Sequence, residues 1–372
     1  MFYKAFGIVN TTRSGIRVEG MQDYRPIGAL SFLGRYRIMD FPISNLSNSG
    51  IDRIQVYVKD NPRSVVEHVG TGRHYNINSK SGRMQILFSD EKTQDIYNTD
   101  IAAYYENMEY IDLMHQPYVV ITPSNMIFKQ DFDALINQHT ESGADITLLY
   151  HSVDNAKEHY LNCDTLELNK QKGVLAIEKN RGTAMKKNIF MDTYVMKKEL
   201  FVELIHKARK ESSMYTMALI VNQLCSELDV RGVAHKGYFA AVTDFKSYYD
   251  ANLSLINIKD AKQLFNNEEW PIYTKTNDSC PTHYHKVGKV KASVISNGCD
   301  IEGTVENSVI GRGCKILKGA VVKNSVVLAE SIIGEDVVVE NMVIDKGVKI
   351  LKVKEVKGTP ENPGYAKRLD TL

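Results

Sequence analysis

The sequence predicts an α/β domain with a mostly parallel sheet, followed by a second domain that is a parallel β-helix. In the first part of the chain, short β-branched or aromatic runs such as residues 54–58 and 146–150 alternate with amphipathic stretches. This alternation is typical of βα units on a mostly parallel sheet. From about Lys289, aliphatic residues recur at roughly six-residue steps, with glycine and small polar residues between them.

The repeat in the second domain indicates which residues fill its core. Each coil of a parallel β-helix has three flat faces, and an inward aliphatic residue at each repeat fills the triangular interior. These inward positions are expected at Ile295, Ile301, Ile310, Ile316, Val327 and Ile333. We therefore divide the chain into an α/β domain at 1–255, a linker at 256–288 and a β-helix at 289–372.

Composition and charge exclude several classes of function. The formal net charge of +1 gives no reason to expect nucleic acid or an anionic membrane as a partner. No segment approaches the roughly 18 uninterrupted apolar residues of a membrane helix and no secretory leader is evident, so we expect a cytoplasmic protein. The five cysteines are widely spaced without a C-x-x-C pair, which favours reduced thiols.

One turn stands where a ligand site would be expected. An apolar strand ends at Thr122-Pro123-Ser124-Asn125. In open α/β sheets, ligands bind beyond the carboxyl ends of the strands.

A long motif connects the chain to a known family. Residues 34–45 read GRYRIMDFPISN and residues 48–51 read NSGI, which closely resembles the G-K-Y-R-I-I-D-F-x-L-S-N…N-S-G-I run of glucose-1-phosphate adenylyltransferases. Further matches follow in the same order at 237–239, 270–274 and 296–303. The resemblance implies a Rossmann-like nucleotidyltransferase domain, a left-handed β-helix, a tetramer, and a role in making ADP-glucose for glycogen.

Residues that would contact phosphates in that family are absent here. Catalytic members begin with a glycine-rich loop, G-G-x-G-x-R-L, whose backbone can approach phosphates closely. The aligned residues 10–17 read NTTRSGIR and keep one glycine. Ile27 stands where the family has a phosphate-binding lysine.

The two carboxylates that hold the family's metal are also replaced. Asn125 takes the place of the aspartate in G-D-H-I-Y, and Ala241 takes the place of the aspartate in G-Y-W-x-D-I-G-T. Mg²⁺ usually keeps one or two protein carboxylates, so we expect no metal and no cofactor in this chain. Rearrangement could bring Asp131 or Asp244 to the metal instead.

The binding residues for sugar phosphate and effectors give a mixed prediction. Glu178 and Lys179 match the pair that binds the sugar and its phosphate in the family, but bulky Phe190 replaces a small serine that faces the sugar. Guanidinium groups suit phosphate oxygens, so a phosphorylated effector could be bound by the arginines of two segments. These are Arg13, Arg17, Arg35 and Arg37.

His283 and His285 form a possible metal pair in the linker. With neither a carboxylate nor a cysteine beside them in the sequence, we expect an exposed strand rather than a metal site.

The chain lacks the family's phosphate- and metal-binding residues but keeps the β-helix and the motif-rich core. This combination predicts a GlgD-type, non-catalytic regulatory subunit. It would join the catalytic subunit in a heterotetramer, with Mg²⁺ required only by that partner, and could form a homo-oligomer alone. Two alternatives remain at this point. One is a divergent but active sugar-phosphate nucleotidyltransferase, and the other is a free-standing sensor of sugar phosphate or nucleotide.

Overall fold

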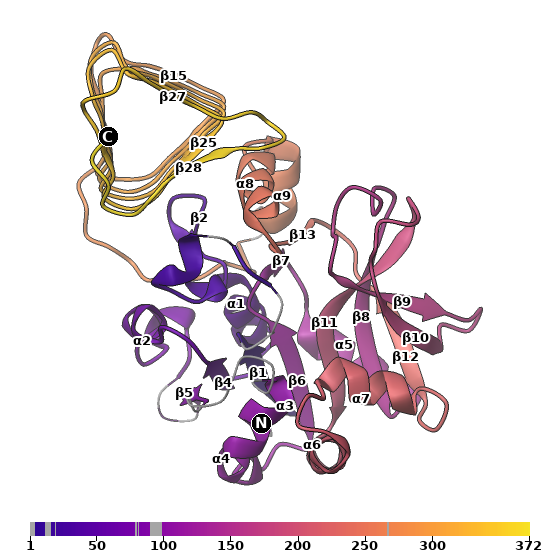
Figure 1. Ribbon diagram of the computed structural model, residues 1–372. Coiled ribbons are helices and arrows are strands. Elements are labelled where there is room, and N and C mark those ends of the chain that lie inside the picture. The colour runs from indigo at the N-terminus through magenta and orange to yellow at the C-terminus, as the bar shows by residue number, and fades with distance from the viewer. Residues whose placement is uncertain are drawn as a thin grey trace.

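The computed structural model describes residues 4–11, 16–18, 20–78, 80, 82–89, 99–265 and 268–372. An α/β domain and a triangular β-helix lie against each other, with helices α8 (Phe245–Ser254) and α9 (Ile258–Phe265) beside their junction (Figure 1). The fold class predicted from the sequence is confirmed. No helix in the described part of the chain is long and apolar enough to cross a membrane.

The α/β domain is built on a sheet with a parallel centre and an antiparallel side. Its main path runs β10-β9-β11-β6-β1-β4-β5, with β8 pairing to β11 and β12 to β8. The pairs β1–β4, β1–β6, β4–β5 and β8–β12 are parallel, whereas β11 runs antiparallel to β6, β8 and β9. The strands are β1 (Ala5–Asn10), β4 (Arg53–Val58), β5 (Arg83–Phe88), β6 (Tyr118–Pro123), β8 (Ile146–Val153), β9 (Asp164–Leu168), β10 (Val174–Lys179), β11 (Lys187–Lys197) and β12 (Val230–Ala234).

Helices cover both faces of this sheet because successive strand side chains point to opposite sides. Val9 belongs to the core cluster beneath one face, and Ile8 to the cluster beneath the other. The first cluster contains residues of α1 (Asp40–Asn48), α2 (Arg63–Val69) and α5 (Phe132–Ser142). The second contains residues of α3 (Asp100–Glu106), α4 (Met108–Asp112), α6 (Lys198–Glu211) and α7 (Met217–Leu224).

Short elements complete the domain. They are the 3₁₀ turns η1 (Met21–Asp23), η2 (Ile27–Ala29) and η3 (Arg73–Tyr75), the hairpin β2 (Ser31–Phe32) with β3 (Tyr36–Arg37), and the pair β7 (Met126–Phe128) with β13 (Phe239–Ala241).

The β-helix consists of three parallel sheets of five strands each. The first sheet is β14 (His283–Tyr284), β17 (Asp300–Ile301), β20 (Lys315–Ile316), β23 (Ile332–Ile333) and β26 (Lys349–Ile350). The second is β15 (Lys289–Lys291), β18 (Thr304–Glu306), β21 (Val321–Lys323), β24 (Val338–Glu340) and β27 (Glu355–Lys357). The third is β16 (Val294–Ile295), β19 (Val309–Ile310), β22 (Val326–Val327), β25 (Met342–Ile344) and β28 (Gly364–Ala366).

Aliphatic residues stack in register through the interior of these coils. Ile301 pairs with Ile316, Ile316 with Ile333, and Ile333 with Ile350, and all four are fully buried. The structure also places α9 and β14 within the segment that the sequence suggested as a linker. β14 forms the first, outermost strand of its sheet.

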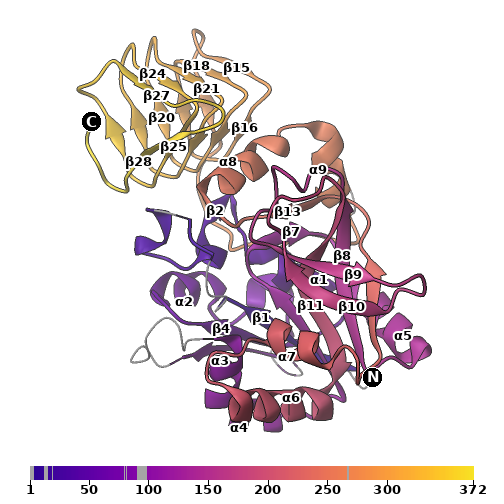
Figure 2. The same ribbon diagram turned by 45° about the vertical axis from the view of Figure 1, so that its right-hand side comes forward.

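The two domains share a buried interface on the outer face of the third sheet of the β-helix (Figure 2). Phe32 and Tyr248 from the first domain share a core cluster with Val326 and Val343 from the β-helix. At Gly34 (φ 66°), an added Cβ would lie 2.4 Å from Ser296 Oγ, so this loop can approach the coil only as glycine.

A buried ion pair also links the domains. Arg25 Nη2 lies 2.5 Å from Asp345 Oδ1 and 2.6 Å from Oδ2, and the Tyr365 hydroxyl donates to Oδ2 at 2.7 Å. Arg25 is 6% exposed and Asp345 fully buried. We call the Arg25–Asp345 contact the interdomain ion pair.

Within the first domain, Asp40 joins three neighbouring segments. Its Oδ1 accepts hydrogen bonds from His68 Nε2 at 2.6 Å and the Tyr75 hydroxyl at 2.5 Å, and its Oδ2 accepts from the Arg37 N–H at 2.8 Å. Burial alone would raise the pKa of Asp40, but His68 and these hydrogen bonds together hold that pKa below its usual value.

This arrangement predicts a particular loss of stability in acid. A carboxyl group whose folded pKa is lowered stabilises the protein above its unfolded pKa of about 4, and that contribution is lost as pH falls through the folded pKa. Asp40→Asn should therefore reduce the free energy of unfolding by about 1–3 kcal/mol at pH 7. Below about pH 4, the free energy of unfolding of this variant should fall less steeply with decreasing pH than that of the parent. Urea unfolding followed by circular dichroism at several pH values measures both effects.

The matched control for this prediction is Asp60→Asn, because the Asp60 side chain is 66% exposed. It should follow the parent at every pH. An Asp40→Asn protein with an acid profile as steep as the parent's would show that Asp40 does not carry this dependence.

Candidate functional site

Asn125 lies in the turn after β6, beyond the carboxyl end of that strand, and serves as an internal hydrogen-bond donor. Its Nδ2 donates to the Val242 carbonyl at 2.9 Å, and the Val242 N–H donates to the Asn125 carbonyl at 2.9 Å. The residue is 2% exposed. An ionised carboxylate at this position could not donate to the Val242 carbonyl, so this hydrogen bond depends on the amide.

Ala241 ends β13 and lies directly beside that turn. It pairs with Met126, the residue after Asn125, and both belong to the same apolar cluster. The structure thus brings together the two positions at which the resemblance places metal-binding carboxylates. One of them holds an amide engaged with the backbone, and the other holds a buried methyl group.

The two aspartates considered as substitutes begin helices. The Asp131 side chain accepts from the Ala134 N–H at 3.1 Å as the N-cap of α5. The Asp244 side chain accepts from the Ser247 N–H at 2.7 Å in a capping box at the start of α8. Both carboxylates therefore satisfy helix N-termini.

Ile27, at the position of the family's phosphate-binding lysine, is 6% exposed and packs in the core cluster that lies between the domains. An apolar contact thus occupies the position of the expected lysine. Thr11 directs its hydroxyl to the Tyr57 carbonyl. Arg17 is exposed, whereas Arg13 lies outside the described residues.

Glu178 and Lys179 are exposed on β10, the edge strand that β9 and β11 separate from β6. Lys179 Nζ lies 3.4 Å from Asp164 Oδ1. Phe190 is fully buried and packs edge-to-face against Tyr194, with ring centroids 5.1 Å apart. The ring therefore contributes to the core of the sheet.

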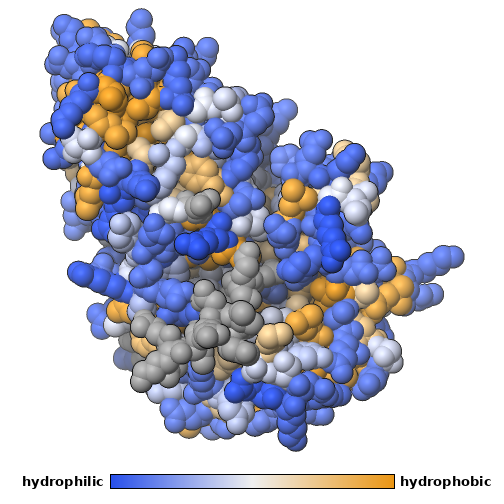
Figure 3. Space-filling view, in the orientation of Figure 1, coloured by the Kyte–Doolittle hydropathy of each residue, from blue (hydrophilic) through white to orange (hydrophobic). Residues whose placement is uncertain are grey.

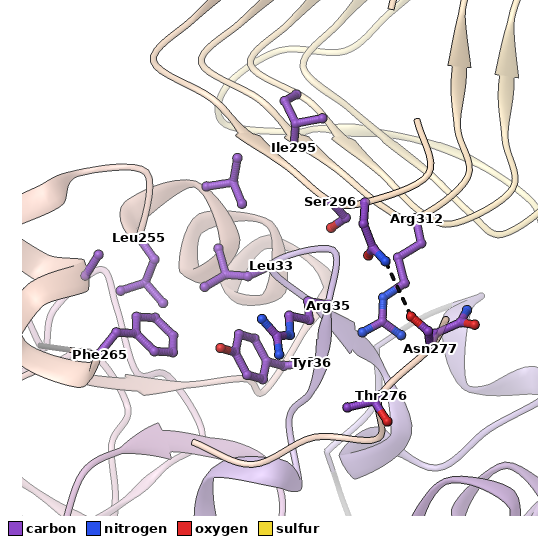
Figure 4. Close-up of a pocket in the computed structure, with 13 residues that line it drawn as sticks. Leu33, Arg35, Tyr36, Leu255, Phe265, Thr276, Asn277, Ile295, Ser296 and Arg312 are labelled. Atoms are coloured by element: carbon purple, nitrogen blue, oxygen red, sulfur yellow. Dashed lines mark hydrogen bonds between the residues drawn. The ribbon is translucent and has the colours of Figure 1, made fainter. Parts of the chain in front are cut away.

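A cavity lies between the domains, and we call it the interdomain pocket. It has a volume of about 500 Å³ and is lined by α9, the Leu33–Tyr36 loop and the first coils of the β-helix. Arg35 and Arg312 enter it from the two domains, with Leu255 and Phe265 on the apolar side (Figure 4). Among the residues described as lining it there is no carboxylate.

The electrostatics of this pocket favour an anion. Burial, and then the charge of Arg35, lower the pKa of Arg312. Arg312 Nε is buried without a hydrogen-bond partner, and within the described chain neither guanidinium forms an ion pair. Two unpaired guanidiniums beside an apolar wall suit a phosphorylated ligand.

Arg37 has different surroundings from Arg35. Its Nη1 donates to the Ala29 carbonyl at 3.0 Å and to Ser31 Oγ at 2.5 Å. Of the four arginines that the sequence suggested, Arg35 lines the interdomain pocket, and the pocket's second guanidinium belongs to Arg312. Sequence reasoning missed Arg312, although its G-R-G-C context marks a turn between coils.

The interpretation of His283 and His285 needs correction. The expectation that no carboxylate lies near them is wrong, because the next coil of the β-helix brings Asp300 against both rings. The missed signal was the D-x-E run at 300–302, one coil after H-x-H at 283–285.

Comparison with known proteins agrees with this architecture. Residues 14–257 match the family model described as nucleotidyl transferase, and residues 279–363 match one described as GlmU-like, C-terminal hexapeptide. The class is thus a nucleotidyl transferase domain followed by a hexapeptide β-helix.

Curated relatives narrow this class. A glycogen biosynthesis protein GlgD of Geobacillus stearothermophilus is 31% identical over 86% of this chain and 83% of its own length. A GlgD of Bacillus subtilis is 28% identical over 96% and 94%, and a glucose-1-phosphate adenylyltransferase of Clostridioides difficile is 30% identical over 81% and 78%. This chain belongs to the family of glucose-1-phosphate adenylyltransferases and GlgD proteins.

Proposed function

We propose that this chain is a regulatory, catalytically inactive subunit that assembles with a catalytic glucose-1-phosphate adenylyltransferase and modulates ADP-glucose synthesis for glycogen. The observation that carries the proposal is the pair Asn125 and Ala241. At the two positions where catalytic relatives are expected to hold Mg²⁺, one side chain donates to a backbone carbonyl and the other is a methyl group.

The expected effect on chemistry is large. Metal assistance to phosphoryl chemistry is worth several kcal/mol, and losing about 4 kcal/mol slows a reaction about a thousandfold. Ile27 adds to this loss, since no cationic side chain stands at its position to neutralise the departing pyrophosphate. On this proposal the chain needs no cofactor of its own, and Mg²⁺ serves the catalytic partner.

Exposed apolar side chains on the β-helix support assembly with other subunits. Apolar side chains gather over part of the β-helix in Figure 3. Near its C-terminal end, Leu351, Val353 and Leu369 are 50%, 38% and 67% exposed. Surfaces of this kind suit subunit contacts, and we propose a heterotetramer with the catalytic subunit and a homo-oligomer when this chain is alone.

The interdomain pocket supports a regulatory role for the assembled subunit. An anion bound by Arg35 and Arg312 would contact both domains at once. A ligand shifts an equilibrium only through different affinity for its states, and a site between two domains senses their relative position. We therefore propose that a phosphorylated effector binds there.

The test is the rate of ADP-glucose formation from ATP, Mg²⁺ and glucose-1-phosphate. The purified chain should give no turnover alone, and titrating it into the catalytic subunit from the same organism should change that subunit's rate saturably. The Arg35→Ala/Arg312→Ala variant should still saturate the partner but lose the response to a phosphorylated effector. Clear turnover by this chain alone would overturn the proposal in favour of a divergent, active sugar-phosphate nucleotidyltransferase.

A further inference from the structure

The outer surface of the first β-helix coils carries four potential metal ligands in a regular array. His283 on β14 pairs in register with Asp300 on β17, and Tyr284 pairs with Ile301. Residues two apart on a strand point to the same face. His283 and His285 therefore share a face with Asp300 and Glu302 of the adjoining strand, while Ile301 fills the interior.

Three of these four side chains bring their ligand atoms close together. His285 Nε2 lies 2.7 Å and His283 Nδ1 lies 3.2 Å from Asp300 Oδ1, and these three ligand atoms all lie within 4.8 Å of one another. Glu302 Oε1 is 3.8 Å from His285 Nε2. A tetrahedral zinc ion with bonds of about 2.0–2.1 Å holds neighbouring ligand atoms about 3.3 Å apart, so the three clustered atoms have the spacing of such a site, with Glu302 beside them.

We propose that His283, His285, Asp300 and Glu302 form a zinc-binding site on the first coils of the β-helix. Two imidazole nitrogens and two carboxylates suit zinc, whereas Mg²⁺ prefers oxygen ligands in an octahedron. The His285, Asp300 and Glu302 side chains are 34%, 39% and 31% exposed, so an ion can reach the site from solvent.

The surroundings of these four side chains favour a bound cation over surface ion pairs alone. Lys315 lies in register with Asp300 on the next coil, yet among the described residues the ion pairs of Asp300 are with the two histidines. The rings of His283 and His285 have centroids only 4.2 Å apart. Two imidazole rings this close can place one nitrogen each on the same cation.

The site would stabilise an exposed end of the fold. Among the described strands, β14 pairs with β17 alone and is the terminal strand of its sheet. Zinc would connect β14 to β17 through side chains and hold the chain where it enters the β-helix. This role is independent of the proposed regulatory function, because it concerns metal binding by this chain alone.

The test is calorimetric titration of ZnCl₂ into the full, untagged chain after treatment with a chelator. We expect one zinc ion per chain with micromolar or tighter affinity and no saturable heat with MgCl₂. Asp300→Asn and His285→Ala should each weaken zinc binding at least about tenfold, as expected for loss of a ligand. His159→Ala, which removes an exposed histidine elsewhere, should bind as the parent does.

Thermal unfolding gives a second measurement and shows that each variant folds. Zinc should raise the melting temperature of the parent and of His159→Ala but not that of His285→Ala. Absence of saturable zinc binding by the parent would overturn the proposal. The four side chains would then form only surface ion pairs between neighbouring coils. Binding of equal strength by the parent, Asp300→Asn and His285→Ala would also overturn it, because the ion would then lie elsewhere.

Discussion

Asp345→Asn should lower the free energy of unfolding by about 3–5 kcal/mol, because it leaves the Arg25 guanidinium buried without a counter-charge. Arg25 is 6% exposed, and both of its short contacts, at 2.5 and 2.6 Å, are to Asp345. The Tyr365 hydroxyl also donates to this carboxylate. Urea denaturation measures the decrease in the free energy of unfolding. Separate unfolding transitions for the two domains would show that their contact has broken.

Two comparisons make this expectation specific. Arg231→Ala breaks an ion pair whose side chains are about 42% exposed, and it should cost less than about 1 kcal/mol. The double variant Arg25→Met/Asp345→Leu removes both charges and should be more stable than Asp345→Asn. A cost for Asp345→Asn no larger than that for Arg231→Ala would mean that the interdomain ion pair contributes little.

Asn125→Asp should destabilise the protein by about 2–4 kcal/mol, even though it restores the acidic residue of catalytic relatives. The new carboxylate would face the Val242 carbonyl that now accepts from Nδ2 at 2.9 Å, and it would be buried, because Asn125 is 2% exposed. Asn125→Ala loses the donor without adding a charge, and it should cost only about 1–2 kcal/mol.

The order of these two variants is the decisive measurement. Urea unfolding of both proteins, with and without excess MgCl₂, should place Asn125→Asp below Asn125→Ala in either condition. ADP-glucose formation by Asn125→Asp should stay at background. If Mg²⁺ selectively stabilised Asn125→Asp, the turn would be a metal site that had lost one ligand rather than a structural turn.

Regular patterns made the fold predictable from the sequence. The stacked residues Ile301, Ile316 and Ile333 occur at repeated positions, and burying an aliphatic residue on each coil has few structural solutions. The alternation of strand-like and helix-like segments likewise predicted the fold class of the α/β domain. The absence of a carboxylate at 125 and 241 was also visible, although the hydrogen bond from Asn125 to Val242 was not.

Contacts between distant residues were not predictable in the same way. Arg312 and Arg35 meet only because the β-helix packs on the Leu33–Tyr36 loop. His283 meets Asp300 because of the length of one coil, and the number of residues between in-register positions varies from coil to coil. Hydrophobic periodicity locates the inward residues but does not determine which outward residues become neighbours.

The first domain holds the β-helix by the outer face of its third sheet. Gly34 approaches Ser296 near the first coils, the Tyr249 hydroxyl donates to the Asn324 carbonyl further along, and Arg25 binds Asp345 beyond that. Because one whole face of the prism is buried, its other two sheets are directed away from the first domain. The interdomain pocket lies at one end of the buried face, beside the first coils. On the proposed function, an anion bound there would affect a neighbouring subunit on the other two sheets only by changing the orientation of the whole prism.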